Sequence, residues 1–177
     1  GFYNMSTLKV GTIQDHANSN TAISIDSSGR VTHPATPRFE AGFSNDDMSN
    51  VGTTDGTDYV FAFTQTIVNV GSHWNGTNTF TAPVNGLYFF YSTLYTNYTS
   101  NYARFSTNLI VNNTKVKQTY GTGHDTETSA HHGFPVFLNA NDTVKCGGTG
   151  YDNNATGNTW QIYRNTIFTN FGGYLIG

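Results

Sequence analysis

Short runs of alternating apolar and polar residues cover most of the chain, and Gly, Asn, Asp and Pro separate one run from the next. Such alternation is typical of strands that bury one face. No window shows sustained helical spacing of apolar residues with caps at its ends. Turn signals recur about every 8–12 residues, as in a sandwich or a barrel, so the sequence predicts an all-β fold. The strands are expected at residues 37–42, 58–70, 78–82, 86–96, 103–111, 115–120, 129–138, 142–147, 159–164 and 166–176.

The expected strand 86–96 is apolar on both faces. It places five aromatic residues between Leu87 and Tyr95. Because side chains alternate in a strand, even-numbered and odd-numbered residues lie on opposite faces, and only one face can meet the chain's own core in a two-layer sandwich. Monomers rarely expose apolar patches beyond a few hundred Å², so a second copy is expected to cover the other face. The residues assigned to this subunit interface are Tyr88, Phe90, Leu94, Phe171 and Tyr174.

Composition narrows the class of protein further. The chain has 177 residues, which suits one domain with or without an arm, and a net charge of −3. Eight Lys and Arg residues against eleven acidic ones leave no basic stripe, so nucleic-acid binding is not expected. No apolar run approaches the roughly 18–20 residues that span a bilayer, and no signal peptide is visible, so membrane insertion is not expected. The single cysteine, Cys146, excludes an intrachain disulfide and is expected to be a buried, inert thiol.

Five segments, in order along the chain, resemble the globular head of the complement C1q-like family. The stretch FTAPVNGLYFFYSTLY resembles that family's signature strand pair, F-x-x-P-x-x-G-x-Y-x-F, and TIVNVGSHWNGTNTF resembles the strand and loop before it. LIVNNTKV resembles the L-x-V-N-G-x-x-V hairpin, with Asn113 where glycine is usual. SAHHGFPVFLNANDTVKC resembles the segment ending in L-x-x-G-D-x-V, with Asn141 in place of glycine, and FGGYLIG resembles the terminal strand. The resemblance covers residues 37–177.

The resemblance implies a fold and a mode of action. It implies a ten-strand jelly-roll β-sandwich, shared with tumour necrosis factor, that assembles as a homotrimer around a three-fold axis. Members bind varied partners and are not enzymes. The residues agree, because no G-x-S-x-G elbow, H-E-x-x-H motif or defined carboxylate pair is present, so no enzyme is expected.

Residues 1–36 are expected to form a separate N-terminal arm, with residues 1–4 read as an addition before a native start at Met5. Their expected strands are too short and too sparsely apolar to form a core alone. The segment is therefore either a flexible tail or an arm that orders against other copies or a larger assembly. The stretches MSTLKVGTIQD and AISIDSSGRVTHPATPRF resemble leaders of tail-fibre and accessory virion proteins of marine bacteriophages, which implies attachment to a virion.

Aromatic residues near predicted loops are the candidates for ligand binding. Rings beside Asn and Asp suit carbohydrate or protein recognition, because they stack on sugars or fill partner pockets. The alternative is that they only cover the ends of the sandwich. The residues assigned to ligand-binding loops are Trp74, Tyr98, Tyr102, Tyr151 and Asn153.

Two histidines and several acidic loop residues are the candidates for metal binding. His131 and His132 are adjacent, so a strand sends them to opposite faces, and one could bind a metal with its copies on the trimer axis. A neutral, hydrogen-bonded histidine is the alternative. The family resemblance also implies Ca²⁺ near the trimer apex, although no acidic loop matches a D-x-D-x-D-G cage and solvated acids are the alternative. The residues assigned to a metal are His132 and Asp125.

These observations predict a trimeric structural and binding module on the surface of a bacteriophage virion. The arm would attach it to other virion proteins, and the head would bind a host-surface glycan or protein. A capsid decoration protein stays open, as does a secreted cellular ligand or lectin of the C1q or tumour necrosis factor type.

Overall fold

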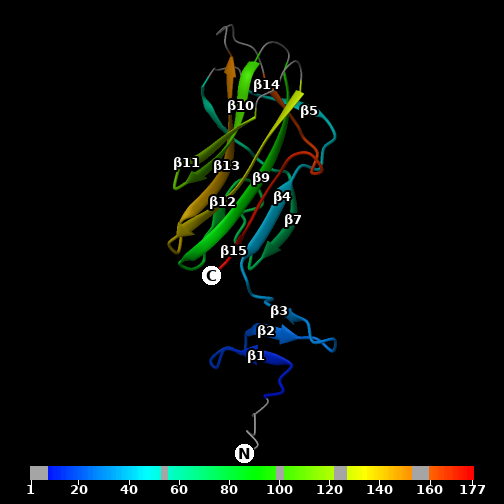
Figure 1. The fold of residues 1–177 in the computed structure, drawn as a ribbon, viewed down its shortest axis with the longest axis vertical. Helices are drawn as coiled ribbons and strands as arrows, with labels where there is room; N and C mark the ends of the chain where they lie inside the picture. Colours follow the sequence, from blue (N-terminus) through cyan, green and yellow to red (C-terminus); the bar gives the residue numbers. More distant parts are fainter. Residues whose placement is uncertain (1–7, 53–55, 99–101, 122–126, 153–159) are drawn as a thin grey trace, which may run out of the picture. The chain divides into compact units, whose positions relative to one another are not determined.

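The computed structural model describes residues 8–52, 56–98, 102–121, 127–152 and 160–177 (Figure 1). The chain divides into two compact units, Gly1–Thr36 and Pro37–Gly177.

The N-terminal unit contains one small antiparallel sheet, with the strand order β1 (Thr12–Gln14), β2 (Thr21–Ile25), β3 (Val31–Thr32). Aspartates close its turns. The Asp15 carboxylate accepts hydrogen bonds from the backbone N–H groups of Asn18 and Asn20, which lower the pKa of Asp15. In the next turn the Asp26 carboxylate accepts hydrogen bonds from the backbone N–H groups of Arg30 and Ser28, which lower the pKa of Asp26. Ile13 and Val31 are exposed, and Ile23 and Ile25 are only half-buried, so the sheet has little core of its own.

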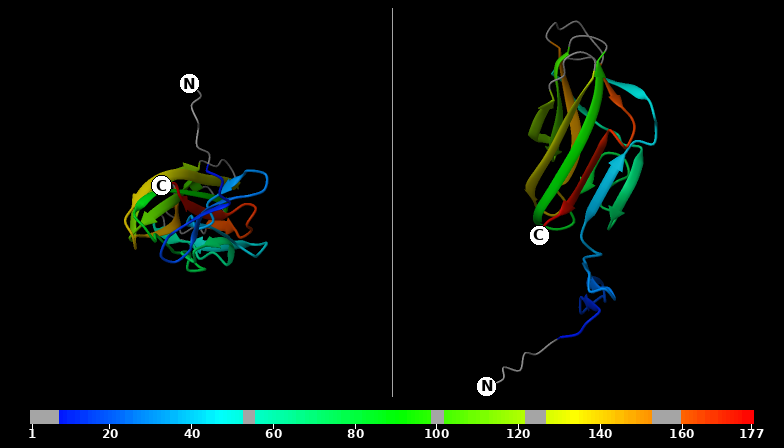
Figure 2. Two further views of the ribbon diagram at one scale, coloured as in Figure 1. Left: turned by 90° about the horizontal axis from the view of Figure 1, so that it is seen from below. Right: turned by 45° about the vertical axis from the view of Figure 1, so that its right-hand side comes forward.

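The second unit is a sandwich of two antiparallel sheets, visible face to face in Figures 1 and 2. The first sheet has the order β5-β14-β9-β15-β4-β7, and β12 pairs with β9. The second has the order β11-β10-β13-β6, and β8 pairs with β13. The strands are β4 (Arg38–Gly42), β5 (Met48–Gly52), β6 (Asp58–Val60), β7 (Gln65–Val70), β8 (Phe80–Thr81), β9 (Gly86–Tyr98), β10 (Tyr102–Val111), β11 (Thr114–Gly121), β12 (Glu127–Leu138), β13 (Thr143–Asp152), β14 (Trp160–Tyr163) and β15 (Asn170–Leu175).

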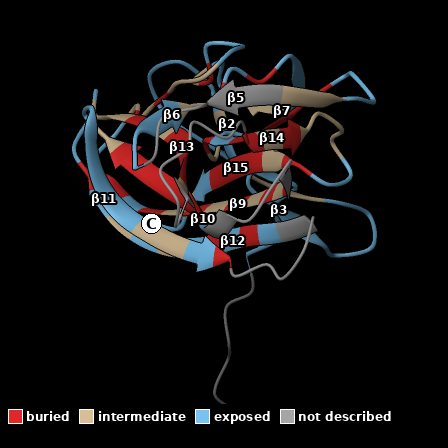
Figure 3. Cartoon of the chain, turned by 90° about the horizontal axis from the view of Figure 1, so that it is seen from above, coloured by how far each residue is buried: buried red, intermediate tan, exposed pale blue. Residues whose placement is uncertain are grey.

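An aromatic core fills the space between the two sheets. Phe39 is central, because its ring stacks on Trp74 at 4.8 Å and on Phe80 at 4.9 Å between centroids and meets the edge of Phe171 at 5.1 Å. Aromatic pairs of this geometry add stability beyond the area that they bury. Figure 3 shows buried residues concentrated on β13, β14 and β15, and exposed residues along β11. The sandwich is thus closed by the chain's own side chains.

The expected strand 58–70 is two strands that belong to different sheets. β6 pairs with β13 in the second sheet, and β7 pairs with β4 in the first. Between them the chain crosses from one sheet to the other, and Phe61 and Phe63 are both buried there. β5 was not expected, because Met48–Gly52 lies in a stretch rich in turn residues, and it forms only by pairing with β14. The all-β prediction is confirmed, since no helix occurs in the described ranges, and hence none there could cross a membrane.

Candidate functional site

Strand β9 decides which residues are available to a partner. Its even-numbered face, with Tyr88, Phe90 and Leu94, is fully buried in the chain's own core, and Phe171 of β15 packs beside it. The prediction that these four residues form a subunit interface is therefore wrong. The reason is physical: the second sheet of the same chain already covers this face, so nothing remains for another copy to bury.

The odd-numbered face of β9 points away from the core and is rich in aromatic side chains. Phe89 packs against Tyr174 of β15 with 5.7 Å between ring centroids. Tyr174 is 43% exposed, and Phe137 of β12 is 65% exposed. Tyr174, assigned to the interface from the sequence, does lie on this outer surface, and its interface role stays a prediction. We call the set Leu87, Phe89, Tyr91, Phe137 and Tyr174 the aromatic face.

Glycines let the rings of the aromatic face lie flat across neighbouring strands. Gly172 pairs with Tyr91, and a Cβ atom at Gly172 would approach the Tyr91 ring to 2.4 Å. Gly133 pairs with Tyr91 from the other side, and a Cβ atom there would lie 2.9 Å from Phe89. Any side chain at these two positions would have to displace a ring. The rings of Tyr91 and Phe89 therefore occupy the space that side chains at Gly172 and Gly133 would fill.

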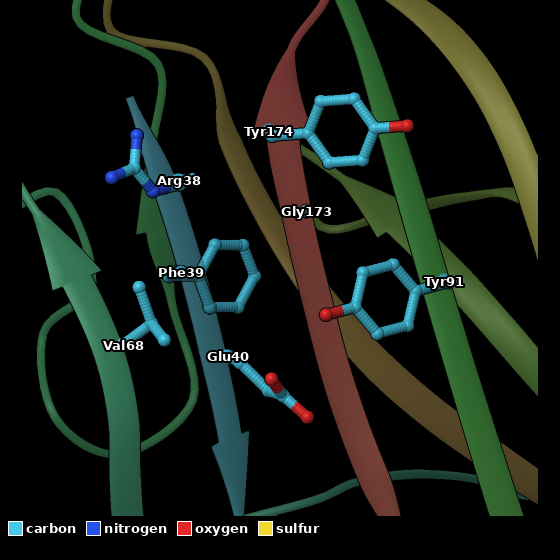
Figure 4. A pocket seen from close by; sticks show the side chains of 7 residues that line it. All are labelled: Arg38, Phe39, Glu40, Val68, Tyr91, Gly173 and Tyr174. Atoms are coloured by element: carbon cyan, nitrogen blue, oxygen red, sulfur yellow. The ribbon is translucent and has the colours of Figure 1, made fainter. Parts of the chain in front are cut away.

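A hollow of about 210 Å³ opens on this same face, lined by residues of β4, β7, β9 and β15. Figure 4 shows the Tyr91 hydroxyl directed across β15 toward Glu40, with Tyr174 above and Val68 on the far wall. Burial raises the pKa of Tyr91, and the negative charge of Glu40 adds to the effect. The hollow therefore combines apolar walls with the Arg38 guanidinium, the Glu40 carboxylate and two phenol groups, and it can accept a protruding side chain.

The outer face of the second sheet has a different character. Arg104 of β10 lies between two tyrosines, with its Cζ atom 4.9 Å from the ring centroid of Tyr120 and 4.6 Å from that of Tyr151. The two rings are 5.9 Å apart, and a hydrogen bond with Tyr151 raises the pKa of Tyr120. Both contacts with Arg104 have the geometry of cation–π interactions. We call these three residues the arginine–tyrosine cluster.

Beside the cluster, along the same face of the second sheet, polar side chains form a continuous network across four strands. Gln118 donates to the Ser106 hydroxyl at 2.8 Å, and Ser106 donates to Asn108 at 3.0 Å. The Asn108 amide in turn reaches Thr149 at 2.7 Å and Asp58 at 3.0 Å. Lys115 completes the network with an ion pair to Asp58 at 2.9 Å, and Ser106, Asn108 and Thr149 are fully buried. The polar side chains of the network hydrogen-bond to one another, and these bonds hold together the strands that carry the cluster.

His132 lies inside the sandwich. Its Nδ1 atom is 3.3 Å from both Ser92 Oγ and Thr107 Oγ1, while its Nε2 atom has no partner among the described residues. Burial lowers the pKa of His132 to about 4, so the ring is neutral at pH 7. The prediction that adjacent histidines face opposite ways is confirmed, because His131 is exposed and His132 is buried. The assignment of His132 to a metal on a trimer axis is wrong, because this side chain faces the chain's own core.

Trp74 also proves to be a core residue. It is 3% exposed and stacks on Phe39, and the Asn69 side chain holds its backbone by accepting from its N–H at 3.1 Å and donating to its carbonyl at 2.9 Å. Its assignment to a ligand-binding loop is therefore wrong. Of the other loop assignments, Tyr151 lies on β13 within the arginine–tyrosine cluster. The side chains of Tyr98, Tyr102, Asn153 and Asp125 lie outside the described residues.

Several acidic residues that the structure describes are already engaged with other side chains. Asp47 pairs with Arg164, and Asp46 accepts hydrogen bonds from Tyr163 and Asn165. Among the described residues, no group of three or more His, Cys, Asp or Glu side chains could hold a metal ion. Cys146 is buried, as expected, and burial raises the pKa of its thiol to about 12. A thiol of that pKa is a poor nucleophile at neutral pH.

Sequence reasoning missed the residues that now define both outer faces. Phe89 and Tyr91 were recognised as one face of a strand, but the even-numbered face was assigned to the interface instead. Arg104 and Tyr120 were not singled out, because their proximity depends on the pairing of β10 with β11 and β13. The available signal was weak: an arginine at the start of an expected strand in a chain with few cationic residues.

The sandwich has the jelly-roll fold of the tumour necrosis factor class. It is similar to murine APRIL, with a TM-score of 0.59 at 9% identity, covering 80% of this chain and 99% of that one. It is similar also to Eiger, a tumour necrosis factor of S. frugiperda, with a TM-score of 0.57 at 12% identity, covering 81% of this chain and 94% of that one. No curated protein sequence matches the chain.

The sequence identifies the family within this fold. The family model of the C1q domain matches residues 42–176, so the chain belongs to the C1q domain family. The resemblance seen in the sequence is thereby confirmed. Domains of this C1q and tumour necrosis factor type are usually trimeric binding modules and typically are not enzymes.

Proposed function

We propose that the protein is the trimeric head of a bacteriophage virion component and that it binds a glycan or protein on the host surface. The observation that carries the proposal is the exposed aromatic face, on a fold whose relatives are usually trimeric binding modules. Three copies that pack these faces together would remove the exposed rings from water. The trimer then presents three equivalent binding surfaces, and three weak sites on one rigid body bind far better than one.

The outer surface of the first sheet has the features of a self-association surface. It is aromatic, and a partner that covers it would remove the exposed parts of Leu87, Phe137 and Tyr174 from water. The hollow beside Tyr91 provides a socket for a side chain of the neighbouring copy. Contiguous exposed apolar patches on a single chain often mark interaction sites.

The N-terminal unit supports a role in attachment. Among its described residues, Leu8 is 81% exposed, Val31 54% and Ile13 46%. Apolar side chains that the unit cannot bury itself are available to other virion proteins. This unit is also the segment whose sequence resembles leaders of phage tail-fibre and accessory virion proteins.

The oligomeric state is tested by light scattering coupled to size exclusion. The wild-type chain is expected to be a trimer at micromolar concentration, and the double variant Leu87→Asp/Phe137→Asp a folded monomer, because two buried carboxylates per copy would disrupt the packed faces. Val116→Asp, an exposed apolar position on β11, is the matched control and should remain trimeric. A monomeric wild type would refute the trimer, and a trimeric double variant would refute the assignment of the face.

A capsid decoration protein is the second candidate, and the exposed apolar residues of the N-terminal unit favour it equally, since the same arm could fix a trimer to a capsid. Antibody labelling of intact particles in the electron microscope separates the two. Label at the tail tip supports host recognition, label over the capsid faces supports decoration, and no label on particles contradicts both.

A further inference from the structure

Arg104 is a cation held against two aromatic rings, and no described residue supplies an anion to neutralise it. Its guanidinium lies over both tyrosine rings of the arginine–tyrosine cluster, and no hydrogen bond or ion pair of Arg104 occurs among the described residues. By contrast, Lys115 pairs with Asp58 and Arg164 pairs with Asp47. The two rings, 5.9 Å apart, lie on one side of the guanidinium, and Arg104 is exposed, so its N–H groups remain accessible to a ligand. A planar guanidinium edge matches a carboxylate through two parallel hydrogen bonds.

Strand pairing and hydrogen bonds fix the position of the cluster. Arg104 is the cross-strand partner of Tyr151, and Ser106, two residues further along the same face, is the partner of Tyr120. Ser106 is buried and belongs to the network that runs through Asn108 to Asp58. Binding groups supported in this way lose little freedom when a ligand arrives, which favours affinity.

The cluster also offers an aromatic surface to solvent. Tyr120 is 43% exposed, and Arg104 is exposed beside it. An exposed ring next to a cation suits a saccharide, because the C–H face of a sugar packs on the ring while the charged edge binds its acidic group. A neutral sugar would leave Arg104 unused, and a simple acidic peptide would leave the ring unused.

We infer that the arginine–tyrosine cluster binds a carboxylate-bearing saccharide, with Arg104 holding the carboxylate and Tyr120 stacking on the sugar ring. This inference rests on the proposed function, since it names the class of host ligand for the head. The site lies on the second sheet, so it stays exposed when the aromatic faces of the first sheet pack together. Each trimer would then carry three such sites.

The test measures the binding of labelled oligogalacturonate and oligoalginate to the full chain by fluorescence anisotropy. Arg104→Gln is expected to weaken binding at least tenfold, and Arg104→Lys to restore only part of it because an ammonium lacks the planar edge. Tyr120→Ala should also weaken binding, whereas Tyr120→Phe should keep most of it because the ring remains. Lys117→Gln is the matched control: it removes the same charge from β11, but its Nζ atom lies 5.6 Å from the Phe134 ring, on the opposite side of the strand.

Each alternative outcome overturns the inference. An equal loss in Lys117→Gln would show that net charge alone attracts the ligand. Equal binding of a neutral oligosaccharide would exclude a role for the carboxylate. Tighter binding of a sulfated oligosaccharide that depends on Arg104 would show that the site recognises sulfate instead of carboxylate. Binding of oligoglutamate as tight as that of the uronates would exclude saccharide recognition, and no binding of either uronate would exclude the site. All variants are first checked for wild-type thermal stability and oligomeric state.

Failure of this inference and failure of the proposed function give different results on host cells. If wild-type trimers bind host cells and Arg104→Gln binds them equally well, the cluster is not the site, while host recognition stands. If wild-type trimers bind no host cell, the proposed function itself fails.

Discussion

The outer faces of the two sheets share one sandwich but have opposite chemistry. On the first sheet, rings such as Phe89 and Tyr91 lie over glycines and leave a flat apolar surface. On the second, a buried chain of hydrogen bonds from Gln118 to Asp58 supports an exposed cation between two tyrosines. An apolar face gains stability by meeting another apolar face, whereas a satisfied polar face gains nothing from self-association. The proposed assembly therefore belongs to the first sheet and the proposed ligand binding to the second.

The largest effect on stability is expected from truncating an inward-facing residue of β9, and its outward-facing neighbour provides the comparison. Phe90→Ala should lower the free energy of unfolding by about 3–5 kcal/mol, because Phe90 is fully buried among Phe80 and Phe171. Phe89→Ala, one residue away, should cost far less stability within a single chain and should weaken assembly instead. Urea unfolding of both variants in the Leu87→Asp/Phe137→Asp background removes the contribution of assembly. Equal losses for the two variants would contradict the assignment of the two faces.

A smaller loss of stability is expected when the pH is lowered, because acid protonates His132, which is buried between the sheets. The pKa of His132 is about 4 in the folded chain and 6.5 as its ordinary value, so the unfolded chain binds more protons between these pH values. The stability that depends on neutral His132 is therefore fully present above pH 6.5. It is lost as the pH falls from 6.5 to 4, which lowers the free energy of unfolding by up to about 3 kcal/mol. Unfolding by urea at several pH values and one protein concentration measures this slope.

The controls for the acid effect come from the two adjacent histidines. His132→Gln should remove most of the slope between pH 6.5 and pH 4, because Gln does not titrate. His131→Gln, which changes the exposed neighbour on the other face, should leave the slope unchanged. An unchanged slope in His132→Gln would show that another group governs the acid response.

The smallest effect is expected in the polar network of the second sheet. Asp58→Ala should lower the free energy of unfolding by about 1–3 kcal/mol, since it leaves the buried Asn108 amide short of an acceptor. Burial alone would raise the pKa of Asp58, but hydrogen bonds from Thr149 and Lys115 outweigh it and lower the pKa. Asp47→Ala breaks an exposed pair with Arg164 and should cost less, about 0–1 kcal/mol.

Asp58→Ala should affect the two outer faces differently. The trimer should persist, because no residue of the aromatic face contacts the network. Binding of uronate oligosaccharides should weaken less than in Arg104→Gln, since only the support of the cluster is lost. A variant that dissociates into monomers would show that the second sheet also takes part in assembly.

Strand positions were largely predictable because they depend on local pattern. The expected strand 86–96 is β9, Gly86–Tyr98, and the expected strand 115–120 is β11, Thr114–Gly121. Errors arose where long-range pairing overrides local preference. Met48–Gly52 has the composition of a turn but pairs with β14, and residues 58–70 read as one strand although β6 and β7 bind different sheets.

The candidate sites were less predictable for a related reason. Trp74 follows a turn and looks like a loop residue, but the core recruits its ring against Phe39. His132 could have faced either side of its strand, and the side that it faces is set by the pairing of β12 with β9. A local sequence window carries no information about such pairings.

The sequence alone determined an all-β head, its membership in a family of binding modules, and the alternation that gives β9 two aromatic faces. Only the tertiary structure decided which of those faces the second sheet covers, because both are equally apolar and alternation is symmetric. The structure likewise brought Arg104, Tyr120 and Tyr151 together from three strands. Their meeting depends on strand register, which is set by contacts between residues far apart in the chain.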